Sequence, residues 1–411
     1  MSSTLIKNIK TIYGIQTQPF PFKKGTAMSV VETLSDAYLL IEGEKIKSFG
    51  PIGLTPERAD LIIDAQGGLV MPAWCDSHTH IVYAQGREGE YVERLKGVSY
   101  AQIALNGGGI LNSASRLQAK SEDDLYLSAK ARLDEVIGYG TGAIEIKSGY
   151  GLTTESELKM LKVIRKLKET SSATIKATFL GAHAIPTVYK NDRQSYIKRI
   201  IEEMLPQVAD EGLADYCDVF CDTGFFTVEE TDKILKAAAQ YGLKAKIHAN
   251  ELAISGGVQV GIANNAISVD HLEAIGEEEI NALLPSNTIP TVLPSCSFFL
   301  NIHDAPARKM IDSGLGIAIA TDYNPGSSPS GNIPLLMAFA CNNMRLLPNE
   351  AFNGVTINGA HAMELSESLG SIAPGKLANI IITNPIPSLD YMVYAFGSQH
   401  INKVLLKGKM V

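Results

Sequence analysis

Two histidines, His78 and His80, end an apolar run and are separated by a single residue. On an extended strand, side chains two positions apart face the same way, so both imidazoles would converge on one point at the end of the strand. Such a pair suits a metal ion, although a His-x-His pair alone is a weak signal. Other polar residues follow later apolar runs and strengthen the case for a metal site.

A three-imidazole, one-carboxylate set results when His248 and Asp322 are added to the first pair. With an open position for water, such a set is typical of a catalytic metal ion, which would acidify the water and polarise the carbonyl under attack. We favour one ion over two, because the fourth apolar run carries no lysine that could bridge a second. Lys147 is interpreted as a structural residue or as a support for the ligands. Zinc and iron both accept this set.

The proton chemistry of hydrolysis is assigned to three residues. Glu251, three residues after His248, could take a proton from the water and pass it to a leaving nitrogen. Asp322 could serve both as a ligand and as a hydrogen-bond partner of that water. His271 could orient the water or stabilise the developing oxyanion; the alternative is a hydrogen-bonding role behind the metal ligands.

Eight apolar runs between residues 69 and 325 must position these side chains. Most are near-continuous hydrophobic segments, as in parallel strands that are buried on both faces. Eight such runs alternating with helical stretches predict a (β/α)8 barrel, whose active sites lie at the carboxyl ends of the strands. Five of the eight histidines fall at those ends. The runs are Leu69–His80, Gly142–Gly151, Ile175–Ala184, Tyr216–Phe225, Lys244–Leu252, Ala266–Ala274, Asn287–Pro294 and Leu315–Asn324.

Helix starts support the alternation. Capping boxes are predicted at Thr154-x-x-Glu157 and Thr227-x-x-Glu230, with a weaker version, Ser121-x-x-Asp124, before a helix over 122–138. A doubly wound open sheet is the alternative fold. It would require a glycine-rich phosphate loop after the first strand, where this chain has His-Thr-His.

The two ends of the chain differ from the middle. Residues 1–68 and 365–411 contain short strand candidates but too little apolar length for a core of their own. We therefore expect both ends to form one composite β-sandwich domain, beside a barrel domain over residues 69–364.

Composition excludes several classes of protein. The net charge is −8 and no lysine or arginine run stands out, so a nucleic-acid partner is not expected. No uninterrupted run of about 18 apolar residues predicts a membrane span, and the first residues lack the apolar core of a signal peptide. Five scattered cysteines are typical of a reducing compartment, which favours a cytoplasmic protein. Cys217 and Cys221 are interpreted as small residues of a buried strand.

The rim residues resemble those of the amidohydrolase superfamily, whose members are metal-dependent hydrolases. The resemblance rests on the His-x-His strand, on His248 and His271, on Asp322 and on the closing segment Gly370-Ser371-Ile372-Ala373-Pro374-Gly375-Lys376-Leu377-Ala378. This chain departs from the pattern at Asn379, where an acidic residue is usual.

Longer motifs resemble the imidazolonepropionase family within that superfamily. The resemblance implies hydrolysis of 4-imidazolone-5-propionate to N-formimidoyl-L-glutamate, the third step of histidine degradation, by a homodimer with one zinc or iron ion per chain. The motifs are His78-Thr79-His80-Ile81-Val82-Tyr83-Ala84, Gly86-Arg87-Glu88, Arg94-Leu95-Lys96-Gly97-Val98-Ser99-Tyr100, Gly107-Gly108-Gly109-Ile110, Lys147-Ser148-Gly149-Tyr150-Gly151-Leu152, Phe179-Leu180-Gly181-Ala182-His183, Cys221-Asp222, His248-Ala249-Asn250-Glu251 and Thr321-Asp322-Tyr323-Asn324-Pro325-Gly326-Ser327.

Residues that suit a small substrate with a ring carbonyl and a carboxylate surround the predicted metal. Arg87 could clamp the carboxylate, or could pair with Glu88 or Glu90 on the surface. The loop after Asp322 could present backbone N–H groups or be a plain turn. The predicted substrate contacts are Arg87, Tyr150, His183, Glu251, Asn324, Gly326 and Ser327, with Tyr100 as a weaker candidate.

Two other functions compete with this one. A deaminase of a nitrogen heterocycle would use the same metal set and Glu251, but a neutral ring needs no arginine clamp. A metal-free barrel that binds ligands or regulates is the second alternative, and the complete set of four ligands with Glu251 disfavours it.

Overall fold

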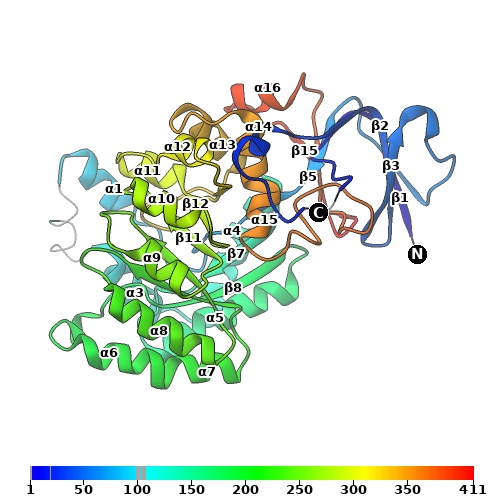
Figure 1. Ribbon diagram of the computed structural model, residues 1–411. Coiled ribbons are helices and arrows are strands. Elements are labelled where there is room, and N and C mark those ends of the chain that lie inside the picture. Colours follow the sequence, from blue (N-terminus) through cyan, green and yellow to red (C-terminus); the bar gives the residue numbers. More distant parts are fainter. Residues whose placement is uncertain (1, 19, 99–101, 103–107) are drawn as a thin grey trace.

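The computed structural model describes residues 2–18, 20–98, 102 and 108–411. It confirms the expected (β/α)8 barrel. Within the described residues, eight parallel strands follow one another in chain order around the barrel (Figure 1). They are β6 (Trp74–Asp76), β7 (Thr141–Lys147), β8 (Thr174–Ala182), β9 (Tyr216–Cys221), β10 (Lys244–Ala249), β11 (Ser268–His271), β12 (Ile289–Val292) and β13 (Ala318–Ile319).

The barrel closes through the segments that follow its first and last strands. Thr79 and Tyr323 form a parallel bridge, in which the His80 N–H donates to the Tyr323 carbonyl at 2.9 Å and the Asp322 N–H donates to the His78 carbonyl at 3.0 Å. The backbone hydrogen bonds that close the barrel therefore belong to three of the four predicted metal ligands.

Helices surround the barrel, as Figure 1 shows. The α-helices are α1 (Glu88–Leu95), α3 (Gly109–Gln118), α4 (Glu122–Gly138), α5 (Thr154–Thr170), α6 (Arg193–Arg199), α7 (Leu205–Asp210), α8 (Val228–Gln240), α9 (Gly257–Ala263), α10 (Glu277–Leu283), α11 (Pro294–Leu300), α12 (Ala307–Asp312), α13 (Ile333–Asn342), α14 (Pro348–Asn353), α15 (Gly359–His361) and α16 (Leu389–Tyr394). Short 3-10 segments are η1 (Gly25–Ser29), η2 (Ile52–Leu54) and η3 (Thr187–Tyr189); π-helical turns are η4 (Ile200–Met204) and η5 (Gly354–Asn358). None of the helices among the described residues is long and apolar enough to cross a membrane.

Two of the three predicted helix caps are confirmed. Ser121 accepts the Asp124 N–H at the start of α4, and Thr227 forms a reciprocal capping box with Glu230 at the start of α8. The third prediction was wrong by one residue, because Thr153 rather than Thr154 caps α5 by accepting the Ser156 N–H. The carboxylate of Glu157 is instead directed to the loop before the helix.

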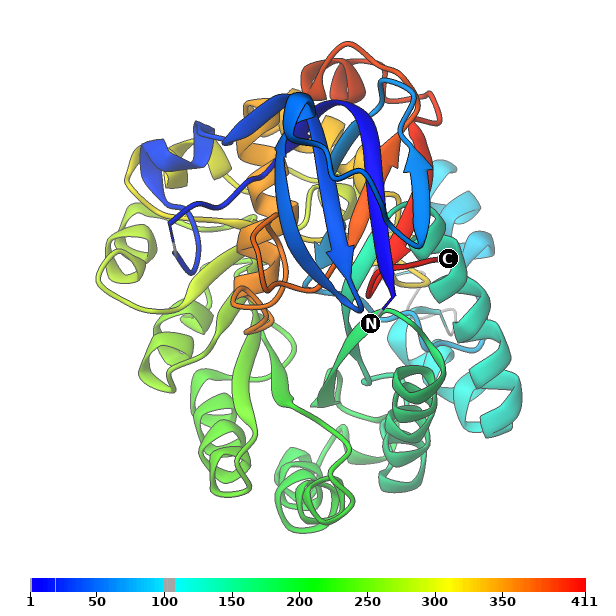
Figure 2. The same cartoon turned by 90° about the vertical axis from the view of Figure 1, so that its right-hand side faces the viewer.

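Both chain ends contribute to a separate sheet, as expected. Its order is β16-β15-β14-β5-β1-β2-β3, with β4 paired to β1. Figure 2 shows the amino-terminal strands, in blue, beside the carboxyl-terminal strands, in red, in front of the barrel. The strands are β1 (Ser3–Tyr13), β2 (Thr33–Glu42), β3 (Lys45–Pro51), β4 (Leu61–Asp64), β5 (Leu69–Pro72), β14 (Ile380–Thr383), β15 (Ile401–Leu406) and β16 (Lys409–Met410).

The apolar run predicted as one barrel strand, Leu69–His80, divides between the two sheets. Its first part is β5 of the flanking sheet and its second part is β6 of the barrel. In β5, Leu69 and Met71 pack into the barrel core, whereas Val70 packs into the core of the flanking sheet. This alternation follows from the two-residue period of a strand, so one face of the flanking sheet is seated on the barrel.

Trp74 stands at this junction and is fully buried. Its indole N–H donates to the Tyr139 carbonyl at 2.9 Å, and its ring meets that of Phe352 edge to face, with centroids 6.1 Å apart. It therefore joins β6 to helices that lie far apart in sequence.

We expect Trp74→Ala to destabilise the fold by about 3–5 kcal/mol, because it leaves a cavity and an unpaired carbonyl. Thermal melting followed by circular dichroism would measure this as a lower midpoint. Val188→Ala, at a side chain that is 85% exposed, is the control. A midpoint for Trp74→Ala within about one degree of the control would contradict the assignment.

Candidate metal-dependent active site

The four predicted metal ligands come together at the carboxyl ends of the barrel strands. The Nε2 atom of His80 lies 3.3 Å from that of His78 and 3.4 Å from that of His248. Asp322 Oδ1 is 3.6 Å from Nε2 of His78 and 3.6 Å from Nε2 of His80. Nitrogen ligands placed about 2.1 Å from one tetrahedral ion are about 3.4 Å apart, so the distances among His78, His80 and Asp322, and that from His80 to His248, are compatible with one transition metal ion.

Two buried carboxylates orient two of these histidines. His78 Nδ1 is 2.6 Å from Asp270 Oδ2, and His248 Nδ1 is 3.0 Å from Asp218 Oδ2. The Asp270 carboxylate accepts a hydrogen bond from the Nδ1–H of His78, which leaves the Nε2 lone pair of His78 for a metal. The Nδ1 of His248 lies within ion-pair distance of Asp218 without a hydrogen bond of good geometry. Burial also lowers the pKa of His78 and of His80 well below the usual range, which keeps both imidazoles neutral, as ligands must be.

Sequence reasoning missed the roles of Asp218 and Asp270. The available signals were weak: Asp218 is a charged residue inside an apolar strand, and Asp270 directly precedes His271. The two-residue alternation of a strand does not reveal either contact, because each aspartate and the histidine beside it lie on different segments of the barrel.

A buried lysine connects the two carboxylates. Lys147 Nζ donates to Asp218 Oδ2 at 2.8 Å and lies 3.8 Å from Asp270 Oδ2. Burial lowers the pKa of Lys147, but the surrounding carboxylates outweigh that effect and raise it above the usual range. Lys147 is therefore a cation beneath the site, which confirms its interpretation as a supporting residue.

Glu251 and His271 lie beside the ligands. Glu251 Oε2 is 3.7 Å from His271 Nδ1. Burial raises the pKa of Glu251 to about 7; the nearby His271 opposes this shift, whereas neighbouring carboxylates add to it. Burial alone would lower the pKa of His271, but the carboxylate of Glu251, helped by that of Glu273, raises it well above the usual range. A base and an acid with these pKa values suit proton transfer near neutral pH.

Strained backbone accompanies these residues. His271 and Leu272 have φ angles of 83° and 71°, and Asp322 has 53°. Non-glycine residues in this region each cost of order 1–3 kcal/mol, and such strain gathers at functional sites. The surrounding barrel thus holds His271 and Asp322 in orientations that an isolated chain would avoid.

A cavity of about 510 Å³ opens above the ligands. Its walls include every predicted substrate contact that the structure describes, whereas Tyr100 lies outside the described residues. Those wall residues are Arg87, Tyr150, His183, Glu251, Asn324, Gly326 and Ser327, together with His80, His248, His271 and Asp322.

The Arg87 guanidinium lies in the cavity wall rather than on the open surface. Its side chain is 10% exposed, and Nη1 is 3.7 Å from Glu90 Oε2. Its Nε is buried and has no hydrogen-bond partner within the described part of the chain. The guanidinium packs directly on Gly326, where a Cβ atom would fall 1.3 Å from Nη2. A side chain at residue 326 would therefore displace the guanidinium from this position.

The loop after Asp322 is ordered by Asn324. Its Oδ1 accepts the N–H groups of Gly326 and Ser327 at 2.7 and 2.8 Å. The expectation that these backbone groups are free for a substrate is corrected, because Asn324 already binds both. Ser327 Oγ donates to Asp322 Oδ2 at 3.2 Å, so the loop also orients the metal carboxylate.

His183 and Tyr150 also line the cavity. The His183 ring stacks on that of His80, with centroids 5.4 Å apart and planes inclined by 14°. Its Nδ1 lies 2.9 Å from the Gly149 carbonyl, and burial lowers its pKa to about 3. Glu157, whose role the sequence did not reveal, accepts N–H groups from Gly149, Gly151 and Leu152 and so shapes the loop that carries Tyr150.

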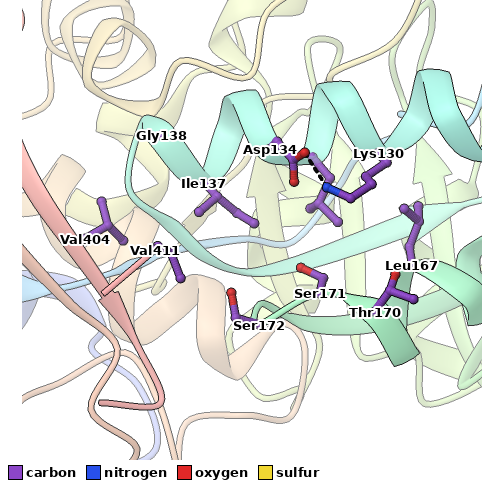
Figure 3. Close-up of a pocket in the computed structure, with 11 residues that line it drawn as sticks. Lys130, Asp134, Ile137, Gly138, Leu167, Thr170, Ser171, Ser172, Val404 and Val411 are labelled. Carbon is purple, nitrogen blue, oxygen red and sulfur yellow. Dashed lines mark hydrogen bonds and ion pairs between the residues drawn. The ribbon is translucent and has the colours of Figure 1, made fainter. Parts of the chain in front are cut away.

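A second hollow, of about 330 Å³, lies outside the barrel. Figure 3 shows it between α4, the end of α5 and the carboxyl-terminal strands, with Lys130 paired to Asp134 at its edge. None of its lining residues is a histidine or a cysteine. It has no set of donors comparable to that above the barrel.

Comparisons with known proteins agree with this geometry. Residues 69–411 match the profile of the Amidohydrolase family. The chain is 53% identical to "Imidazolonepropionase" of Flavobacterium johnsoniae, over 99% of this chain and 100% of that protein. It is 41% identical to the protein of the same name in Thermoanaerobacter pseudethanolicus, over 98% of this chain and 96% of the other.

Solved structures with the same fold are distant in sequence. A triazine hydrolase variant superposes with a TM-score of 0.77 at 17% identity, over 99% of this chain and 94% of its own. An adenosine deaminase from Xanthomonas campestris with bound zinc has a TM-score of 0.73 at 15% identity, over 100% of this chain and 92% of its own.

We expect Asp270→Ala to weaken metal binding by about 10–100-fold, because His78 loses the partner that fixes its ring and tautomer. Competition with a chelator would measure the affinity of the folded, metal-free protein for Zn²⁺. Asp222→Ala is the control, since that buried carboxylate accepts the backbone N–H groups of Thr223 and Leu252 and not a histidine. Equal affinities of the two variants would contradict the role of Asp270.

Proposed function

The chain belongs to the amidohydrolase family, and we propose that it hydrolyses 4-imidazolone-5-propionate to N-formimidoyl-L-glutamate in histidine degradation. The curated relatives named imidazolonepropionase, at 40–53% identity over nearly the whole chain, support this reaction. The observation that carries the proposal is the position of Arg87 in the wall of the same cavity as His80, His248 and Asp322, three of the four residues proposed to hold the metal.

The substrate carries a carboxylate at one end and a ring carbonyl at the other. Arg87, with a buried Nε that has no partner among the described residues, binds the carboxylate through charged hydrogen bonds. The Tyr150 and His183 side chains, which also line the cavity, contact the ring of the substrate. This arrangement directs the carbonyl toward His78, His80, His248 and Asp322.

The cofactor is a divalent metal ion, which the donor set and the family support. We propose one ion of zinc or iron per chain, held by His78, His80, His248 and Asp322. When bound, the ion supplies Lewis acidity that polarises the ring carbonyl and makes a water molecule easier to deprotonate.

Glu251 and His271 move the protons. Glu251 takes a proton from the attacking water and delivers it to the ring nitrogen as the bond between that nitrogen and the carbonyl carbon breaks. His271, whose pKa is raised, donates a hydrogen bond to the oxygen that gains negative charge. The water adds one oxygen and two hydrogens to the product, so no other reactant is consumed.

Deamination of a nitrogen heterocycle is not favoured. A neutral ring would leave the Arg87 guanidinium without an anion in the cavity, and the desolvation of that charge would be uncompensated. We also propose, from the resemblance alone, that the enzyme is a cytoplasmic homodimer.

Protein with one zinc ion per chain should convert 4-imidazolone-5-propionate to a product heavier by one water, as mass spectrometry would detect. We expect Glu251→Gln to lower kcat by about 10²–10⁴-fold, because an amide cannot accept the proton. Metal content of this variant should not change. Glu277→Gln, at a carboxylate that is 79% exposed, is the control. No conversion by the one-zinc wild-type protein would refute the substrate.

Arg87→Met should raise KM by roughly tenfold or more, because a charged hydrogen bond to the substrate is lost. Gly326→Ala should act in the same direction, since the new methyl group displaces the guanidinium. Gly89→Ala is the control, because a Cβ atom there meets no other atom within 4 Å. Steady-state kinetics would separate KM from kcat, and an unchanged KM in both variants would show that the carboxylate binds elsewhere.

A further inference from the structure

A set of metal donors that includes sulfur lies on the side of Glu251 and His271 that faces α11. A Glu251 carboxylate oxygen, a ring nitrogen of His271 and the Cys296 sulfur are all within 4.8 Å of one another. Cys296 is fully buried on α11, and His271 is 3% exposed. None of the four residues proposed to hold the catalytic ion belongs to this set.

Two buried polar atoms face one another here without hydrogen-bond partners among the described residues. They are His271 Nδ1 and Glu273 Oε2, which are 3.6 Å apart. Glu251 Oε2 lies 3.7 Å from the same nitrogen. Ser297 on α11 donates to the other oxygen of Glu273 at 3.0 Å, which holds this carboxylate in place. Unsatisfied buried polar atoms are rare in proteins and call for an explanation.

We propose that Glu251, His271 and Cys296 form a second cation site and that it takes a soft divalent ion such as Zn²⁺ or Cd²⁺. A thiolate and an imidazole select such ions over Mg²⁺ or Ca²⁺, and three protein donors leave a fourth tetrahedral position for water. Binding forms a metal–sulfur bond and a metal–nitrogen bond, and it releases the thiol proton of Cys296 and the ring proton of His271 to solvent. The carboxylates compensate the charge of the ion.

The site would regulate the enzyme by occupying its proton shuttle. A Glu251 carboxylate that ligates a second ion cannot accept a proton from water, so an excess of soft metal should inhibit hydrolysis. Binding at this site stands on its own geometry, whereas the inhibition rests on the proposed function. His271 lies between the two sites, since its ring nitrogen also comes within 4.8 Å of those of His78 and His248.

The direct test is a titration with Cd²⁺ of protein that holds one zinc ion per chain, without substrate. A thiolate-to-cadmium charge-transfer band in the ultraviolet reports a bond to sulfur. We expect the band to saturate at one further ion per chain. Exchange of cadmium for zinc at the first site gives no such band, because that site contains only nitrogen and oxygen donors. Absence of the band, or a second ion without it, overturns the proposal.

Cys296→Ser should abolish the band and weaken binding of the second ion by at least about tenfold. The matched control is Cys341→Ser, at a free cysteine on α13, which should keep both the band and the affinity. Glu273→Gln retains the thiol and tests the site if the serine variant folds poorly; it should keep the band at about tenfold weaker affinity. Persistence of the band in Cys296→Ser overturns the assignment of the thiol.

Activity provides the second arm of the test. In the one-zinc wild-type protein, hydrolysis should fall over the same cadmium concentrations at which the band appears, and Cys296→Ser should resist this inhibition. Equal inhibition of both proteins would overturn the regulatory role. If the one-zinc protein has no activity on 4-imidazolone-5-propionate, the proposed function fails, while the band still decides whether the site exists.

Discussion

The structure depends on a network of charges buried inside the barrel. Two lysines and three acids are fully shielded from water and pair with one another within β7 and across the barrel interior, between strands that are not neighbours. A buried charge that loses its partner costs about 3–5 kcal/mol, so the strands can assemble only in the register that pairs all of these groups. The members are Glu145 and Lys147 of β7, Asp218 of β9, Lys246 of β10 and Asp270 of β11.

This network also prepares the site for a cation. One carboxylate oxygen of Asp270 lies beside His78, and one of Asp218 lies beside His248. The Lys147 ammonium group lies near both carboxylates. The charges of the network, two positive and three negative, sum to −1. With Asp322 added, these groups carry a formal charge of −2, which a divalent ion offsets.

The closure of the barrel and the chemistry share the same few residues. His78, His80 and Asp322 make the backbone hydrogen bonds that join the first strand to the last, and their side chains converge on one point. A shift of this junction would move three ligands at once. Function and fold are therefore coupled at the rim, which is where the strained φ angles of His271 and Asp322 also occur.

The sequence by itself determined the barrel and which residues gather at its rim as the proposed metal donors. Continuous apolar runs indicate parallel strands that are buried on both faces. Because a barrel brings the carboxyl ends of all its strands to one rim, His248 and Asp322 could be placed near His78 from the sequence. The division of Leu69–His80 between two sheets was not predicted, because apolar residues continue on both sides of Pro72, where β5 ends. Only the tertiary structure decided which acid orients which histidine, that Asn324 occupies the loop N–H groups, and that Cys296 faces Glu251. These contacts join residues that are far apart in the chain, and their distances are set by side-chain packing across the barrel. Such packing produces no repeating pattern in the sequence from which it could be predicted.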